Sequence, residues 1–392
     1  MNLFRRMSTV RLVALLGALA AVVLVAGIAV ARERSAPKPP PKALAQALHD
    51  ALTAKPVQGI SARVTFTDHL FPTGAIGSGS GSALLSGATG RLWLSNDGRF
   101  RLELQSDTGD TQIMGDHSSL RVYDASRNQE YVLPLKHSGS SDSKPQHGDH
   151  AVPTVAAIRS ELSRLAGAVD ITGAVPGDIA GRPVYSVRIS PRHDGGLLGG
   201  LQLAWDAQRG VPLKVAIYSR GDTAPVLALT ATDVHYGPVS GSDLTVHPAA
   251  GTKVTTVTLP TAPPAHAHGR HTHASVSGVA AVAKRLPFSL SAPSSLVGLP
   301  RQSVRLVDAG GERAALVVYG KGLGAIVVLQ QQATGGSDPL AGLPQVSING
   351  ASGRELATAL GTVLRFQRGG VAYTLLGSVP PVAAEAAARG LS

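Results

Sequence analysis

The stretch GGLQLAWDAQRGVPLKVAIYSRG, residues 199–221, contains two runs of alternating residues on either side of a polar turn at 206–210. Alternation at period two is typical of β-strands, so this stretch predicts a hairpin with a five-residue loop. One face of the hairpin is apolar and carries Leu201, Leu203, Trp205, Leu213, Val215 and Ile217. The other face is mixed and carries Gln202, Ala204, Lys214, Ala216 and Tyr218. Each large apolar side chain contributes about 1.5–3 kcal/mol when it leaves water, so a core, a partner or a ligand must cover the apolar face.

Further strand patterns precede and follow the hairpin. Between residues 62 and 259 they amount to about eleven strands of one predominantly antiparallel sheet, including a strand at 243–246. Two helical patterns interrupt them, an amphipathic one at 43–54 and a second at 154–169. A helix inserted between strands of one sheet has to lie on that sheet. The sequence therefore predicts a large sheet that two helices partly cover.

The composition excludes several kinds of site. The 392 residues include 45 glycines, 26 prolines and no cysteine, and only 4% of them are aromatic. The absence of cysteine excludes disulfides, thiolate metal ligands, cysteine catalysis and a lipid-modified cysteine anchor. The net charge of +11 favours anionic surroundings such as phospholipid headgroups. The sequence shows no nucleic-acid-binding motif, so we predict no nucleic-acid partner.

The N-terminus predicts export from the cytoplasm. Three arginines precede an uncharged apolar run of 20 residues at 12–31. This run has the composition of a signal peptide and also the length to span a membrane, so residues 1–34 are either a cleaved signal or a retained membrane anchor. Either alternative places the rest of the chain on the periplasmic or cell-envelope side. Residues 35–42 form a proline-rich spacer.

The hydrophobic pattern divides the chain into two domains. Residues 43–260 form the first domain, 261–284 a His/Pro-rich linker, and 285–392 a small α+β domain. Alternating runs in the second domain predict strands. Helices are predicted there at 352–361 and at 380–391, the second of which has proline at its start and glycine at its end.

The linker contains the densest group of metal-binding side chains, His266, His268, His271 and His273. Imidazoles in a flexible tract chelate zinc or copper, but a structural or catalytic zinc site needs fixed ligands and supporting hydrogen bonds. We therefore predict a polar spacer, with no metal and no cofactor.

No set of residues predicts catalysis. Asp and His residues occur close together at 68–69, 149–150 and 233–235, and we interpret them as chance pairs. No serine lies in a nucleophile elbow, and no H-E-x-x-H motif is present. The glycine-rich run 77–82 lacks the lysine of a phosphate-binding loop. The sequence therefore predicts that the protein is not an enzyme.

Three stretches carry a resemblance to a known family. RLWLSNDGRFRLELQSDTGDTQI (91–113), LRVYDASRNQEYVLPL (120–135) and LQLAWDAQRGVPLKVAIY (201–218) resemble sheet segments of LolA/LppX-like lipoprotein-sorting proteins of actinobacteria. In the second domain, residues 314–331 and 371–391 are similar to the C-terminal domain of RseB-like proteins. The chain thus resembles a LolA-like carrier in an RseB-like two-domain arrangement.

The resemblance implies an α+β protein whose unclosed antiparallel half-barrel has lid helices and an apolar concave face that holds acyl chains of a lipid or lipoprotein. The expected cavity residues are Leu102, Leu104, Val187, Ile189, Leu201, Leu203, Trp205, Val215 and Ile217. The implied function is non-enzymatic binding for transport or sensing outside the cytoplasm. The alternative is an RseB-like regulator that binds a membrane anti-sigma factor. Because this chain has no lipidated cysteine, anchoring would require an uncleaved N-terminal helix.

Overall fold

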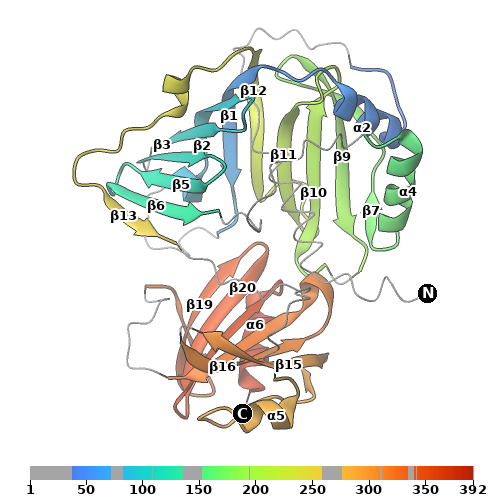
Figure 1. The fold of residues 1–392 in the computed structure, drawn as a ribbon. Helices are drawn as coiled ribbons and strands as arrows, with labels where there is room; N and C mark the ends of the chain where they lie inside the picture. Colours follow the sequence, from blue (N-terminus) through green and yellow to red (C-terminus); the bar gives the residue numbers. More distant parts are fainter. Residues whose placement is uncertain are drawn as a thin grey trace, which may run out of the picture.

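The computed structural model describes residues 38–71, 83–107, 109–135, 152–193, 195–257, 276–309, 311–333, 340 and 342–391. These residues form a mostly β structure with two sheets, drawn one above the other in Figure 1. The predicted signal or anchor, the start of the spacer and most of the linker lie outside the described residues. None of the helices in the described ranges is long and apolar enough to cross a membrane.

The first sheet contains thirteen strands in the order β13-β6-β5-β4-β3-β2-β1-β12-β11-β10-β9-β7, and β8 pairs with β9. Its first six strands in the sequence are β1 (Gly59–Asp68), β2 (Ala88–Ser95), β3 (Phe100–Ser106), β4 (Gly109–Gly115), β5 (Ser119–Asp124) and β6 (Gln129–Pro134). The others are β7 (Val169–Ile171), β8 (Val175–Ile179), β9 (Arg182–Pro191), β10 (Leu198–Asp206), β11 (Pro212–Ser219), β12 (Leu227–Tyr236) and β13 (Lys253–Thr256).

The strand prediction needs two corrections. The short strands β7 and β8 were not predicted, because three and five residues carry too little alternation to detect. Residues 243–246 were predicted as a strand, but the chain there forms the 3-10 turn η2 (Gly241–Leu244), which Ser240 caps through its side chain. The pairings of the sheet are antiparallel except that β13 runs parallel to β6. The hairpin of β10 and β11 is confirmed.

The sheet is strongly curled. In Figure 1 its strands β2, β3, β5 and β6 run across the view, whereas β9, β10 and β11 stand nearly upright. The register shifts between Arg63 and Val64 and between Ala204 and Trp205. Such bulges increase the local right-handed twist of a strand. The curled sheet with few helices agrees with the predicted half-barrel.

Helices α2 (Leu44–Thr53) and α4 (Val155–Leu165) confirm the two predicted helices. The side-chain oxygen of Thr154 accepts a hydrogen bond of 3.2 Å from the backbone N–H of Ala157, which caps the start of α4. The two helices pack against each other beside β9 and β7 (Figure 1). A short helix, α3 (Ala83–Ser86), was not predicted and packs on β1, β3 and β4.

The chain after β12 crosses the outer face of β2 and β3. The guanidinium of Arg101 donates to the carbonyl of Asp243 at 3.3 Å, and the backbone N–H of Ala249 donates to the hydroxyl of Tyr123 at 3.3 Å. The crossing brings β13 to the free edge of β6, and this return path explains their parallel pairing.

The second sheet contains eight strands in the order β14-β15-β16-β17-β21-β20-β19-β18. They are β14 (Ser295–Leu296), β15 (Leu299–Ala309), β16 (Glu312–Tyr319), β17 (Ile326–Gln332), β18 (Gln345–Ile348), β19 (Ala351–Thr358), β20 (Gly361–Arg368) and β21 (Val371–Gly377). The helical elements are α5 (Val279–Ala283), the 3-10 turn η3 (Gly322–Gly324) and α6 (Pro381–Arg389). The core of this unit includes Val282 of α5.

The helix predicted at 352–361 is wrong, because these residues form most of β19 and its turn into β20. The inward positions of β19 are Gly353 and Glu355, which are both buried. A Cβ atom added to Gly353 would lie 3.3 Å from the Cβ of Phe366, so glycine leaves room for that ring. Since neither residue is apolar, the alternation typical of a strand is absent. The predicted C-terminal helix is confirmed as α6.

In the described part of the chain, backbone N–H groups join the two units by hydrogen bonds at Leu197 and at Ala359. The backbone N–H of Leu197 donates to the carbonyl of Ser378 at 3.1 Å and to its side-chain oxygen at 2.9 Å. The backbone N–H of Ala359 donates to the carbonyl of Leu70 at 2.8 Å. The second unit therefore touches the chain just before β10 and just after β1.

Glu355 provides a test of the second core. Burial raises the pKa of its carboxyl, and the neighbouring Glu385 raises it further. The native state thus binds the proton more tightly than the unfolded state, so stability falls as pH rises from the ordinary pKa of about 4.3 through the raised value. We expect Glu355→Gln to raise the melting temperature at pH 7 and the advantage to vanish below about pH 4. Thermal melts across this pH range measure it.

The matched control is Glu312→Gln, which changes an exposed carboxylate of the same sheet. It should shift the melting temperature little at any pH. A Glu355→Gln protein that is less stable than the natural protein at pH 7 would show that the carboxylate is well solvated.

Candidate functional site

Seven of the nine predicted cavity residues lie on one face of three neighbouring strands. Leu201 lies opposite Ile217 on β11 and Ile189 on β9, and Leu203 lies opposite Val215 and Val187. Directly opposed residues of adjacent strands point to the same face. Trp205 follows on the same face of β10.

Leu102 and Leu104 lie on β3, and four strands separate β3 from β10 in the sheet. They are buried in a second group of side chains, the central cluster. Its fully buried members are Ile60, Ala62, Val64, Ala83, Leu92, Leu94, Phe100, Leu102, Leu104, Val184, Ala204, Val211, Leu213, Ala231 and Val234. A row of directly opposed residues, Leu203, Val215, Leu229 and Phe66, connects this cluster to the hairpin on one face.

The helix α2 covers one end of the hairpin face. Ala47 of α2 is buried together with Tyr185, Val187 and Trp205, a group that we call the α2 cluster and that also includes Ala174. The ring centroids of Tyr185 and Trp205 are 6.3 Å apart. The indole of Trp205 is 3% exposed. The apolar face of the hairpin thus packs partly on a helix, as the resemblance implied.

Both ends of α2 are fixed to the sheet. Before the helix, the hydroxyl of Tyr185 donates a hydrogen bond of 2.6 Å to the carbonyl of Pro40. At the other end of α2, the carbonyl oxygen of Ala51 lies close to Gly210 in the hairpin turn. A Cβ atom added to Gly210 would be only 2.3 Å from that oxygen. The described end of the spacer and the hairpin turn therefore hold α2 in place.

The hairpin tip is buried on both faces. At the bulge, Ala204 pairs with Lys214 while Trp205 pairs with Pro212, so Leu213 falls out of the simple alternation. Leu213 and Ala204 both belong to the central cluster, although the alternation placed them on opposite faces. The bulge therefore lets Ala204 and Leu213 both reach the central cluster.

Asp206 fixes the turn at this tip. Its carboxylate accepts hydrogen bonds from the backbone N–H groups of Gln208 and Arg209 at 2.8 and 3.0 Å and from the hydroxyl of Tyr236 at 2.8 Å. The guanidinium of Arg182 lies 5.1 Å from the centroid of the Tyr236 ring. The buried carboxylate is thus fully hydrogen-bonded and holds the tip against β12.

Between the two clusters lies an apolar band, which we define as Leu201, Val215, Ile217 and Leu227. Ile217 lies directly between Leu201 on β10 and Leu227 on β12. All four side chains are half-buried, and none of them belongs to a buried cluster of the described residues. The band is therefore the part of this face that the described helices leave uncovered.

The band ends at a carboxylate. Leu227 lies directly opposite Asp68, whose carboxylate accepts a hydrogen bond of 2.6 Å from the backbone N–H of Leu70. Burial raises the pKa of Asp68. The ring of the neighbouring His69 contacts the carbonyl of Pro225 at 3.3 Å. Among the described residues, Asp68 and His69 thus bond to different partners and not to each other, and only the register reveals that Asp68 borders the band.

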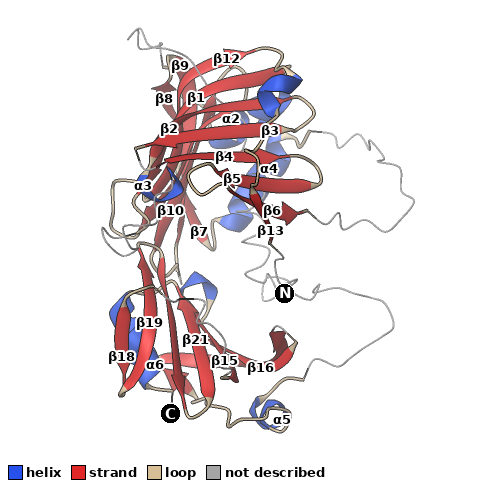
Figure 2. Ribbon diagram, turned by 90° about the vertical axis from the view of Figure 1, so that its left-hand side faces the viewer, coloured by secondary structure: helices blue, strands red, loops and turns tan. Residues whose placement is uncertain are grey.

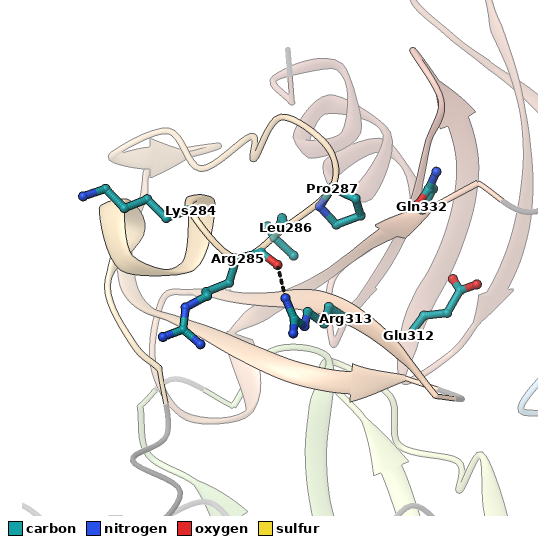
Figure 3. Close-up of a pocket in the computed structure, with 7 residues that line it drawn as sticks. All are labelled: Lys284, Arg285, Leu286, Pro287, Glu312, Arg313 and Gln332. Atoms are coloured by element: carbon teal, nitrogen blue, oxygen red, sulfur yellow. Dashed lines mark hydrogen bonds between the residues drawn. The ribbon is translucent and has the colours of Figure 1, made fainter.

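A pocket of about 430 Å³ lies elsewhere, on the second unit (Figure 3). Its lining includes three cations, Lys284, Arg285 and Arg313, together with Glu312. Figure 3 shows Lys284 and Arg285 extending away from the pocket, while Arg313 donates to the carbonyl of Arg285 at 3.4 Å. The charges diverge, so this pocket does not concentrate them on one ligand.

Within the described ranges, no group of three or more His, Cys, Asp or Glu side chains is arranged to hold a metal ion. The four histidines of the linker and the glycine-rich run 77–82 lie outside the described residues.

Comparison with solved structures gives matches to two kinds of protein. A chain of the Pseudomonas aeruginosa MucA/MucB complex has 17% identity and a TM-score of 0.41, and the match covers 88% of this chain and 95% of that one. A structure of MucB with MucA(peri) gives 17% identity, a TM-score of 0.40 and the same coverage. A LolA superfamily protein from Nitrosomonas europaea gives 11% identity and a TM-score of 0.22, with coverage of 52% and 98%.

No family model and no curated protein sequence matches the chain. The matches thus include MucB and a LolA superfamily protein, the kinds of protein that the sequence resembles, at identities of 17% or less and TM-scores below 0.5.

The fixation of α2 gives a test. Gly210 has a φ of +68° and Gly221 a φ of +88°, so alanine strains the backbone at either position. Only Gly210 also meets the helix, because nothing lies within 4 Å of a Cβ atom at Gly221. We expect Gly210→Ala to cost about 1–3 kcal/mol more stability than Gly221→Ala, the usual range for overpacking. Urea unfolding of both variants measures the difference.

Displacement of α2 should also shift the tryptophan fluorescence of Gly210→Ala to longer wavelength, because Trp205 lies beneath the helix. Equal losses of stability and unchanged spectra in both variants would mean that α2 is free to move at this end.

Proposed function

We propose that the first domain binds an apolar ligand, the acyl chain of a lipid or lipoprotein, on the apolar band. The observation that carries this proposal is the half-burial of Leu201, Val215, Ile217 and Leu227 on a face whose two sides are fully covered. The role is non-enzymatic. The export signal predicted from the sequence places it outside the cytoplasm.

The energetics favour a ligand that covers the band lengthwise. Apolar surface gives about 25 cal/mol for each Å² that leaves water, or about 0.8 kcal/mol for each buried CH₂ group. An acyl chain that lies along the row of Leu201, Ile217 and Leu227 would bury several such groups together with the three side chains. The band offers no hydrogen-bonding side chains. An acyl chain forms no hydrogen bonds, so it loses none when it binds there.

The positions of the helices α2 and α3 define how the ligand would enter. α2 is fixed at Pro40 and Gly210, and α3 packs on β1, β3 and β4. Neither helix therefore has to lift to expose the band. The ligand would approach the uncovered strands β11 and β12 between them, so α2 acts as a fixed wall of the site.

The second candidate is a regulator that binds a membrane-bound anti-sigma factor. Apolar side chains of a protein segment fit the band by the same chemistry as an acyl chain. The RseB-like arrangement of two domains in the sequence motivates this candidate. The two candidates differ in what must be added to cover the band, a lipid or a polypeptide.

A substitution in the band separates binding from folding. Ile217→Gln places an amide against the ligand, and we expect uptake of a fluorescent fatty acid to weaken by about 1–3 kcal/mol, or roughly 5- to 150-fold in Kd. The melting temperature should change little, because the side chain is half-buried and outside the clusters. Fluorescence titration and thermal melting are measured on the same samples.

The matched control is Lys214→Gln, a half-buried position of the same strand on the opposite face. It should change neither quantity. Natural protein that takes up no fatty acid would remove the lipid proposal, and capture of an anti-sigma-factor segment that Ile217→Gln abolishes would then support the second candidate. Normal fatty-acid uptake by a folded Ile217→Gln protein would exclude the band as the site.

A further inference from the structure

The outer face of β1, β2 and β3 carries a second pocket, of about 240 Å³. Figure 2 shows these three strands side by side. The pocket is lined by Arg63, Val64, Thr65, Thr89, Gly90, Arg91, Glu103, Gln105 and Thr232.

Two arginines face each other across this pocket. Arg63 on β1 lies directly opposite Arg91 on β2, and both side chains are exposed. Directly opposed side chains of an antiparallel pair have Cβ atoms about 4.5–5.5 Å apart, and like charges in this position destabilise the pair. Arginine stays charged at any physiological pH. The fold therefore holds two positive charges together.

The acids around the pocket neutralise this pair only in part. Glu103 lies opposite Arg91, but its carboxylate pairs with the guanidinium of Arg101 at 2.8 Å and accepts from the amide of Gln105 at 2.9 Å. Asp233 lies opposite Arg63 and is buried; burial raises the pKa of Asp233, and the charge of Arg63 opposes this only in part. In the part of the chain that the structure describes, no carboxylate lies within ion-pair distance of Arg63 or Arg91.

The rest of the pocket supplies hydroxyl donors. Thr65 lies directly opposite Thr89 on the same face as the two arginines. Thr232 falls at the register shift where β12 pairs Ala231 with Val64 and Asp233 with Arg63, so it has no partner position on β1. The bulge thus adds a third hydroxyl beside the cations.

We infer that this pocket binds a phosphate group between Arg63 and Arg91, with Thr65, Thr89 and Thr232 as further donors. Guanidinium groups bind phosphate through two parallel hydrogen bonds, and a tetrahedral anion with several acceptor oxygens uses two guanidinium groups and hydroxyls together. The group belongs to a phospholipid headgroup or to free phosphate. The inference goes beyond the proposed function, because the pocket lies on the opposite face of β1 from the central cluster.

The test measures binding of inorganic phosphate to the full chain by calorimetry, at an ionic strength of about 0.15 M. We expect a Kd below about 1 mM. Arg63→Gln and Arg91→Gln should each weaken binding about tenfold or more, and the double variant should abolish it. Arg305→Gln, which removes an exposed arginine from a strand of the second sheet, is the control and should leave binding unchanged.

Stability supplies a readout that distinguishes a lost site from a misfolded protein. Without phosphate, either single variant should melt at or above the temperature of the natural protein, because one of two facing cations is gone. Phosphate should raise the melting temperature of the natural protein and not that of the double variant. If a single variant without phosphate melted below the natural protein, other groups of the chain would already compensate the charges of the two arginines.

Vesicles identify the source of the phosphate. Phosphatidylcholine vesicles with and without phosphatidylglycerol are tested by flotation. Retention on the phosphatidylglycerol vesicles that requires Arg63 and Arg91 indicates a headgroup, whereas binding of inorganic phosphate alone indicates the free anion. Absence of both, equal losses in Arg305→Gln, or acetate binding as tightly as phosphate would overturn the inference. Fatty-acid uptake by the double variant should remain normal, so the two proposals fail separately.

Discussion

The bulge at Ala204 and Trp205 is the constraint on which the arrangement of the first domain depends. Neighbouring side chains of a strand point to opposite faces, so one of the two normally faces solvent. Here Trp205 packs under α2 while Ala204 and Leu213 join the central cluster. The tip of the hairpin is therefore a middle layer, with a helix on one side and the core of β1 and β12 on the other. A curled sheet can fill part of its own concave side in this way, without a further helix.

The same strands carry opposite chemistry on their two faces. On β1, Val64 is 2% exposed and belongs to the central cluster, whereas the neighbouring Arg63 is exposed beside Arg91. A β-strand provides this separation at no cost in length, because alternate side chains belong to different environments. The apolar face favours acyl chains and the basic face favours anions. A single lipid that carries an acyl chain and an anionic headgroup would reach both faces only around an edge of the sheet. Otherwise it would have to bridge two protein molecules.

The sequence predicted those parts of the fold in which the local pattern and the packing agree. The hairpin of β10 and β11, the amphipathic helix α2 and the capped helix α4 all show apolar residues at the period of their own structure. The pattern failed at β19, where the inward residues are Gly353 and Glu355, and at β7, which has three residues. In these cases the sheet imposes the conformation through neighbours that lie far away in the sequence.

The candidate sites were predictable to different degrees. Alternation placed Leu201, Leu203, Trp205, Val215 and Ile217 on one face of the hairpin, and the register of β9 adds Val187 and Ile189 to that face. The bulge that brings Ala204 and Leu213 into one cluster was not predicted, since it has no signature in this stretch. The arginine pair was not predicted at all, because Arg63 and Arg91 are 28 positions apart and only the register of β1 and β2 brings them together. Asp68 reaches the band through the register of β1 and β12 in the same way.

The contacts with the second unit lie at the ends of the strands that border the apolar band. β10 begins at Leu198, directly after Leu197, which is bonded to Ser378. β1 ends at Asp68, and Leu70, two residues later, is bonded to Ala359. The second unit thus holds β10 and β1, between which lie the strands β11 and β12 that carry Ile217 and Leu227. The contacts between the two units and the apolar band therefore lie at the same end of β10, β11, β12 and β1.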